Sequence, residues 1–152
     1  MDRARKLAAH IRRTVTGPMW HGPALAEVLE GVTHERAAGR PTAGGHSIWE
    51  IVLHVTAWSD IARLRLQGEA TGDPTPEHDW PPVGASDRAA WTQAIDRLGV
   101  SHHALAAAIR KLTDEQLDAK VRGLEYTVEI LLDGVVEHGT YHGGQIALLK
   151  KA

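Results

Sequence analysis

Apolar residues recur every three to four positions along most of the chain, which is the spacing of amphipathic helices. The clearest helix begins at Ser47, where Ser47 and Glu50 form an S-x-x-E capping box, and it ends before Gly68. Its stripe consists of Ile51, Val55, Trp58, Ala62 and Leu66. Three more long helices are predicted, over residues 2–15, 87–112 and 127–150. There is no useful length of period-two alternation, so no strand is predicted.

Shorter segments separate these long helices. Helical turns are predicted over residues 23–29, from Thr33 to Gly39, and after the capping box of Thr113 and Gln116. Residues 68–86 are rich in Gly, Pro, Asp and Glu, which indicates a long loop, with Trp80 as its anchor on the core. We therefore predict an all-α protein, a four-helix bundle with a long crossover loop and short extra helical turns, in a single domain over residues 1–152.

Two histidines interrupt the apolar stripe of the last helix. His138 and His142 continue the series Leu131, Val135 and Leu149. Residues four apart lie on one helix face, with Cβ atoms about 6 Å apart, so the two imidazoles can bind one metal ion. No glutamate lies between them, so the H-E-x-x-H mechanism of zinc proteases is not indicated. Spacing alone leaves metal binding and a hydrogen-bonded or exposed pair as alternatives.

A third ligand must come from another helix, and two histidines compete for the role. His54 lies beside Ile51 and Trp58 on the helix that begins at Ser47. His102 lies in the apolar stripe of the helix predicted over residues 87–112. Helical spacing does not rank one above the other.

The last helix also contains glycines, each of which costs up to about 1 kcal/mol against alanine. They are Gly134, Gly139, Gly143 and Gly144. Close packing against a neighbouring helix is the favoured explanation. A second explanation, compatible with the first, is that missing side chains leave room for a ligand beside the histidines.

Composition limits the partners and the chemistry. The net charge is −2, and there is no basic block, so neither a nucleic-acid nor a membrane partner is expected. The chain has no cysteine, which excludes disulfides, thiolate ligands and a cysteine nucleophile, and any thiol would have to be a cosubstrate. No segment approaches the roughly 20 apolar residues of a membrane span, and the N-terminus lacks the apolar core of a signal peptide. We therefore expect a soluble, cytoplasmic protein.

Several stretches, in this order, resemble the DinB/YfiT-like family of metalloenzymes, over about Gly17 to Lys150. They are GPMWHGPALAEVLEGVT, GGHSIWEIVLHVTAW, HDWPPVG and HGTYHGGQIALLKK. The resemblance implies a four-helix bundle with a long crossover connection and a three-histidine site for a divalent ion. Carried over to this chain, the ligands are His54, His138 and His142, which places His54 ahead of His102. No catalytic residue is assigned.

The resemblance also implies a class of function. Three imidazoles suit Zn, Ni, Fe and Cu alike, so the ligands do not identify the metal. Similar proteins include thiol-dependent S-transferases, which implies a low-molecular-weight thiol cosubstrate and a small-molecule substrate that the sequence does not identify. The alternatives are a metal-dependent hydrolase, using a loop residue such as Glu77, His78 or Asp79, and a non-catalytic bundle that binds a metal or small molecule. Bundles of this type often pair, so a homodimer is a further expectation.

Three more side chains are candidates for contacts with the ligands. Gln145 lies one turn past His142, and Tyr141 lies beside it in the sequence. Glu50 lies one turn before His54 and could accept an imidazole N–H if its capping role leaves it free.

Overall fold

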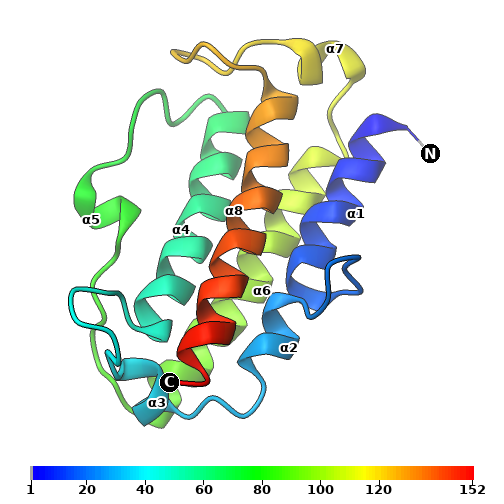
Figure 1. Cartoon of the computed structure of the whole chain (residues 1–152). Helices are drawn as coiled ribbons and strands as arrows, with labels where there is room; N and C mark the ends of the chain where they lie inside the picture. Colours follow the sequence, from blue (N-terminus) through cyan, green and yellow to red (C-terminus); the bar gives the residue numbers. More distant parts are fainter. Residues whose placement is uncertain (1) are drawn as a thin grey trace.

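Four long helices form the bundle in the computed structural model, which describes residues 2–152 (Figure 1). They are α1 (Arg3–Thr16), α4 (Ile48–Leu66), α6 (Arg88–Ile109) and α8 (Val128–Leu149). The short helices are α2 (Leu25–Leu29), α3 (His34–Ala38), α5 (Pro76–Asp79) and α7 (Asp114–Asp118). Across residues 2–152 there are isolated β-bridges but no strand, so the predicted all-α fold is confirmed.

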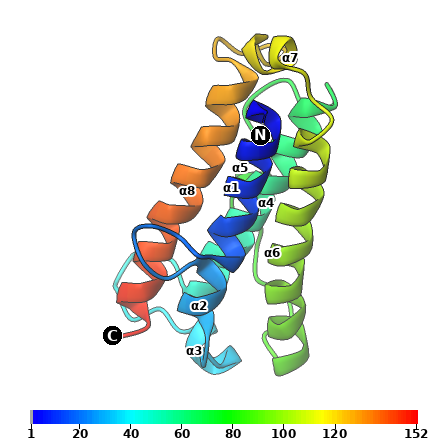
Figure 2. The same ribbon diagram turned by 90° about the vertical axis from the view of Figure 1, so that its right-hand side faces the viewer.

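The order of the helices requires a long connection. Helix α4 packs against α6 and α8, and α1 packs against the same two helices. Because α4 and α6 run in the same direction, the chain between them returns along the whole bundle, beside α4 (Figures 1 and 2). The crossover is as predicted, but its description as a loop is incomplete, because it contains α5. Thr75 caps α5 and Pro76 occupies its first turn, a local signal for a helix start.

Side-chain caps determine where the long helices begin. Each N-cap side chain accepts a hydrogen bond from the backbone N–H three residues later; the caps are Asp2, Ser47, Asp87 and Thr127. Such a cap is worth about 1 kcal/mol. Helix α6 ends at Ile109 rather than at the predicted Leu112. The reason is local, since Thr113 is extended to cap α7, and a helix cannot continue into that conformation.

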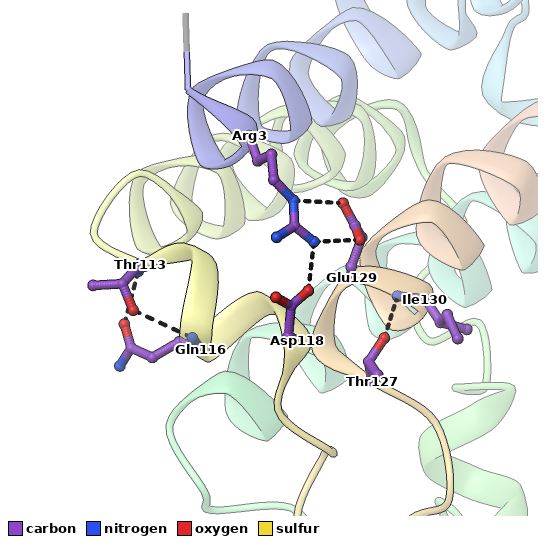
Figure 3. A network of polar contacts seen from close by, with 7 residues as sticks. All are labelled: Arg3, Thr113, Gln116, Asp118, Thr127, Glu129 and Ile130. Atoms are coloured by element: carbon purple, nitrogen blue, oxygen red, sulfur yellow. Dashed lines mark hydrogen bonds and ion pairs between the residues drawn. The ribbon is translucent and has the colours of Figure 1, made fainter.

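Arg3 ties three helices together at one end of the bundle (Figure 3). Its Nη2 donates to Asp118 at the end of α7, at 2.7 Å, and to Glu129 in the first turn of α8, at 2.6 Å. The hydrogen bond from Arg3 lowers the pKa of Asp118. The short helix α7 is thereby held against the start of α8.

The interior consists of two apolar clusters separated by polar side chains. One cluster includes Trp49, Trp91 and Leu98, and the other includes Ile11, Leu105 and Leu132. Along every long helix, buried polar residues separate the members of one cluster from those of the other. We call them the polar layer; they are Thr14, His54, Thr56, Ser59, Ser101, His102 and His142.

None of the helices described over residues 2–152 combines the length and the apolar character needed to cross a bilayer.

Candidate metal centre

Three histidines from two helices meet in the bundle. Nε2 of His138 lies 2.8 Å from Nε2 of His54 and 3.1 Å from Nε2 of His142. One nitrogen from each ring can be chosen so that all three lie within 4.8 Å of one another. His54 and His142 are each 5% exposed. The structure therefore brings together the three residues that the family resemblance implied as ligands.

His102, the competing candidate, lies in the polar layer but outside this cluster. Its Nδ1–H donates to the carbonyl of Leu98, one turn earlier on α6, at 2.9 Å. Its Nε2 is buried without a hydrogen-bond partner among residues 2–152. Helical spacing could not separate His102 from His54, because both point into the bundle and only the positions of the neighbouring helices distinguish them.

Contacts behind the rings determine which nitrogens carry hydrogen. Nδ1 of His54 lies 2.6 Å from the carbonyl oxygen of Asp79, and Nδ1 of His142 lies 2.6 Å from Oε1 of Gln145. Both partners are acceptors, so both Nδ1 atoms are donors and both Nε2 atoms present lone pairs to the cluster. Nε2 of His138 lies between these two nitrogens and can donate a hydrogen bond to only one of them. A cation at this point would satisfy all three nitrogens, and the rings of His54 and His142 have behind them the acceptor that is typical of metal-binding histidines. The residues present therefore fit a divalent ion.

Asp79 contributes to the site in a way that the sequence did not indicate. The residue was considered only as a base, yet its backbone carbonyl orients His54. Its carboxylate accepts from Nε1 of Trp58 at 2.7 Å and also lies 3.3 Å from Nδ1 of His54. Glu50, the alternative partner for His54, is occupied, because it accepts from the backbone N–H of Ser47 at its own helix start.

Trp80 covers the cluster from the crossover. Its ring stacks on His54, with centroids 3.7 Å apart and planes 4° from parallel, and His46 stacks on it at 3.6 Å. The expected anchoring residue of the loop thus packs directly on a candidate ligand. The stack fixes the ring plane of His54, which its Nδ1 contact alone would leave free to tilt.

Burial keeps the three imidazoles neutral. It is the main cause that lowers the pKa of each ring, and it lowers that of His138 to about 3, helped by its neighbours His142 and His54. Metal ions bind the neutral form of imidazole. The site is therefore ready for a cation at neutral pH without first losing protons.

A pocket of about 540 Å³ opens beside the histidines. It is lined by His54, Trp58, Asp79, Tyr126, Ile130, Leu131, Gly134, Val135, His138, Tyr141 and His142. A Cβ added to Gly134 would meet nothing within 4 Å, so this glycine leaves space in the pocket wall. A Cβ at Gly139 would lie 2.6 Å from Cγ2 of Thr14, so that glycine is needed for packing against α1. Close packing therefore explains Gly139, and Gly134 has the open space that the second explanation requires.

Comparison with known protein families agrees with this geometry. The family model of the DinB superfamily matches residues 20–146. The chain belongs to the DinB superfamily. No curated protein and no solved structure matches it significantly.

The DinB match covers the whole candidate site. It includes α4 with His54, the crossover with Asp79 and Trp80, and the part of α8 that carries His138 and His142. Helix α1 precedes the match, although it packs against α6 and α8 in the bundle. The DinB region thus supplies all three candidate ligands together with Asp79, Trp80 and Gln145, which contact their rings, and α1 packs against α6 and α8 outside the match.

Proposed function

We propose that this DinB-superfamily protein is a metal-dependent enzyme whose divalent ion is held by His54, His138 and His142. The proposal is carried by one observation, the convergence of their Nε2 atoms with two lone pairs directed inward. When bound, such an ion acts as a Lewis acid that polarises an oxygen or lowers the pKa of a coordinated thiol or water. The open pocket beside the rings gives a small molecule access to them.

The lining of the pocket favours a thiol as the nucleophile. Asp79 is the one carboxylate among its lining residues, and that group already accepts from Trp58. A thiol has an ordinary pKa near 8.5 and needs less help from a base than water does. We therefore propose S-transfer from a low-molecular-weight thiol. The thiol sulfur bonds to an electrophilic carbon, the leaving group departs with the electron pair, and the thiol proton goes to solvent.

A hydrolase is the second candidate, and Asp79 is the observation in its favour. Its carboxylate lies beside the cluster, 3.3 Å from Nδ1 of His54, where it could accept a proton from an attacking water. Chelator-sensitive cleavage of an ester or amide panel, lost in Asp79→Asn, would favour this reaction over S-transfer.

Metal analysis of purified protein tests the ligand assignment. Wild type should contain about one divalent ion per chain, and His54→Ala and His138→Ala should each lose it, because two imidazoles bind far more weakly than three. His103→Ala is the matched control, since His103 is exposed on α6 and should leave the metal content unchanged. Stoichiometric metal in both site variants would contradict the assignment.

Cobalt substitution tests the thiol. Adding glutathione, cysteine or coenzyme A to the cobalt protein should change its visible spectrum if the sulfur reaches the ion. The absence of a change with every thiol tested, combined with a full metal complement, would remove S-transfer and leave the hydrolase. Metal that raises the unfolding temperature without any turnover would instead indicate a non-catalytic bundle.

A further inference from the structure

Arg65 is a buried cation without a carboxylate partner. It is 5% exposed, and the ion pairs formed within residues 2–152 do not include it. Its Nη1 donates to the hydroxyl of Tyr126 at 2.7 Å and its Nη2 to the carbonyl of Gly72 at 2.8 Å. Its Nε has no acceptor in the described part of the chain. A guanidinium stays charged in proteins, and buried charges are ordinarily paired, so this arrangement needs an explanation.

The charge lies at the end of the pocket away from the histidines. Tyr126, which Arg65 contacts, lines the pocket, and the guanidinium carbon lies 5.4 Å from the ring centre of Trp58, another lining residue. Arg65 follows His54 by eleven residues on α4, so their backbone positions are roughly 16 Å apart along the helix axis. The guanidinium itself lies nearer the site, because the ring of Trp58 is also 5.8 Å from the ring of His138. Helix α8 runs the opposite way and gives the same order, because Tyr126 precedes its first turn and His138 lies in its middle.

The wall between the two ends is apolar. Ile130, Leu131 and Val135 line it, and Gly134 adds no side chain. The lining carboxylate, Asp79, is at the histidine end. An elongated ligand in this pocket therefore meets polar groups at its two ends and apolar groups in between.

Tyr126 is placed to convey the charge of Arg65 to a ligand. Because its hydroxyl oxygen accepts from Nη1, its hydrogen remains available for another acceptor. Hydrogen bonds in a chain polarise one another, and a bond to an anionic oxygen is stronger than one to a neutral oxygen. A carboxylate at the Tyr126 hydroxyl would thus bond to a polarised donor and offset a cation that no acidic side chain neutralises.

We propose that Tyr126, with Arg65 behind it, binds a carboxylate at the far end of the molecule whose reacting end lies at the histidines. The substrate class is an elongated compound with an anionic group separated from its reacting atom by an apolar segment. This inference rests on the proposed function only for the assignment of the reacting end to the histidine cluster.

Two matched probes test the subsite on the full-length, zinc-loaded protein. They are 11-mercaptoundecanoate and 11-mercaptoundecanol, which share a thiol and an apolar chain and differ only in the charge at the far end. Binding is followed by tryptophan fluorescence, to which Trp58 in the pocket wall contributes. Wild type should bind the carboxylate at least tenfold more tightly than the alcohol, and Tyr126→Phe should abolish that preference. Tyr141→Phe is the comparison, because it removes the other tyrosine hydroxyl of the pocket, which accepts from Gln145 at the histidine end. It should change the affinities of both probes alike and keep the preference for the carboxylate.

The outcomes separate this inference from the proposed function. Equal affinity of wild type for both probes, no binding of either, or an undiminished preference in Tyr126→Phe would each overturn the subsite. Repeating the binding measurements on the zinc-free protein tests whether the thiol of the probe binds the metal. If zinc removal leaves both affinities unchanged, the thiol function fails, while a carboxylate preference that depends on Tyr126 still supports the subsite. Unfolding temperature and far-UV circular dichroism establish that each variant is folded.

Discussion

Substitution of two glycines in α8 provides a direct test of how closely that helix packs. Gly139 faces α1, where a Cβ would lie 2.6 Å from Cγ2 of Thr14, whereas a Cβ at Gly144 would meet nothing within 4 Å. The same change to alanine should therefore raise the free energy of unfolding at Gly144, and should leave it unchanged or lower it at Gly139.

The magnitudes follow from two competing effects. Alanine in place of glycine inside a helix gains up to about 1 kcal/mol. In Gly144→Ala no steric cost opposes this gain, because the position is exposed and an added Cβ would meet no atom within 4 Å. In Gly139→Ala it is opposed by overpacking, which costs about 1–3 kcal/mol. The two variants should thus differ by about 1–3 kcal/mol, or roughly 2–12 °C in unfolding temperature for a chain of this length.

The assay is thermal unfolding followed by circular dichroism in chelator, so that metal binding does not contribute. Thr14→Ser supplies the decisive comparison, because it removes Cγ2 and keeps the hydroxyl that donates to the carbonyl of His10 at 3.1 Å. In that background the penalty of Gly139→Ala should shrink by about 1 kcal/mol, measured as the coupling energy of a double-mutant cycle. Equal unfolding temperatures for the two alanine variants, or zero coupling with Thr14→Ser, would refute the close approach of α1 and α8.

Three further predictions concern the site and the core. If the ion is present at a hundred times its dissociation constant, its removal by a chelator should lower the free energy of unfolding of wild type by about 2.7 kcal/mol. The unfolding temperature of His54→Ala should not change. Equal shifts in the unfolding temperatures of the two proteins would contradict the ligand role of His54. The pKa of His138 is lowered to about 3 in the folded, metal-free chain. Below pH 6.5 the unfolded chain therefore binds a proton that the folded chain does not. The free energy of unfolding, measured by urea titration, should fall as the pH is lowered from 6.5 toward 3. His138→Leu should flatten that slope, and an unchanged slope would exclude this histidine as its source. Nε1 of Trp91 donates to the buried carbonyl oxygen of Val32 at 2.8 Å, and Trp91→Phe removes this donor. The free energy of unfolding should fall by about 1–3 kcal/mol, measured as a lower urea midpoint. An unchanged midpoint would show that the carbonyl finds another donor.

The helices were predictable because their determinants are local. Ser47 and Glu50 mark a helix start within four residues of sequence, and both form the hydrogen bonds of the capping box. Helix α5 was missed because four residues are too few to show a period. The signal that could have revealed it was the pair Thr75 and Pro76, a cap followed by the residue best suited to a first turn.

The site was predictable only in part, because some of its contacts are not local. His138 and His142 are four apart on one helix, so their common face can be read from the sequence. The third imidazole depends on how α4 and α6 pack against α8, and for that reason spacing alone left His54 and His102 unranked. The acceptor behind His54 is a backbone carbonyl, that of Asp79, which no pattern of side chains encodes.

The polar layer also restricts how the helices can align along their axes. A slip of any one helix by a single turn, about 5.4 Å, would move its hydroxyls or imidazoles into an apolar cluster and bring aliphatic groups opposite the polar side chains of its neighbours. Several of these side chains bond within their own helix, as Thr14, Thr56 and His102 do, so those bonds would survive the slip. A hydrogen bond between helices would be lost at a cost of about 1–3 kcal/mol, whereas an entirely aliphatic interior would tolerate the shift more easily. Ser101, whose hydroxyl donates to the carboxylate of Asp60 on the neighbouring helix α4 at 2.9 Å, matches only one alignment of α6 with α4. The residues that give the interior its chemistry therefore also determine the axial register of the helices.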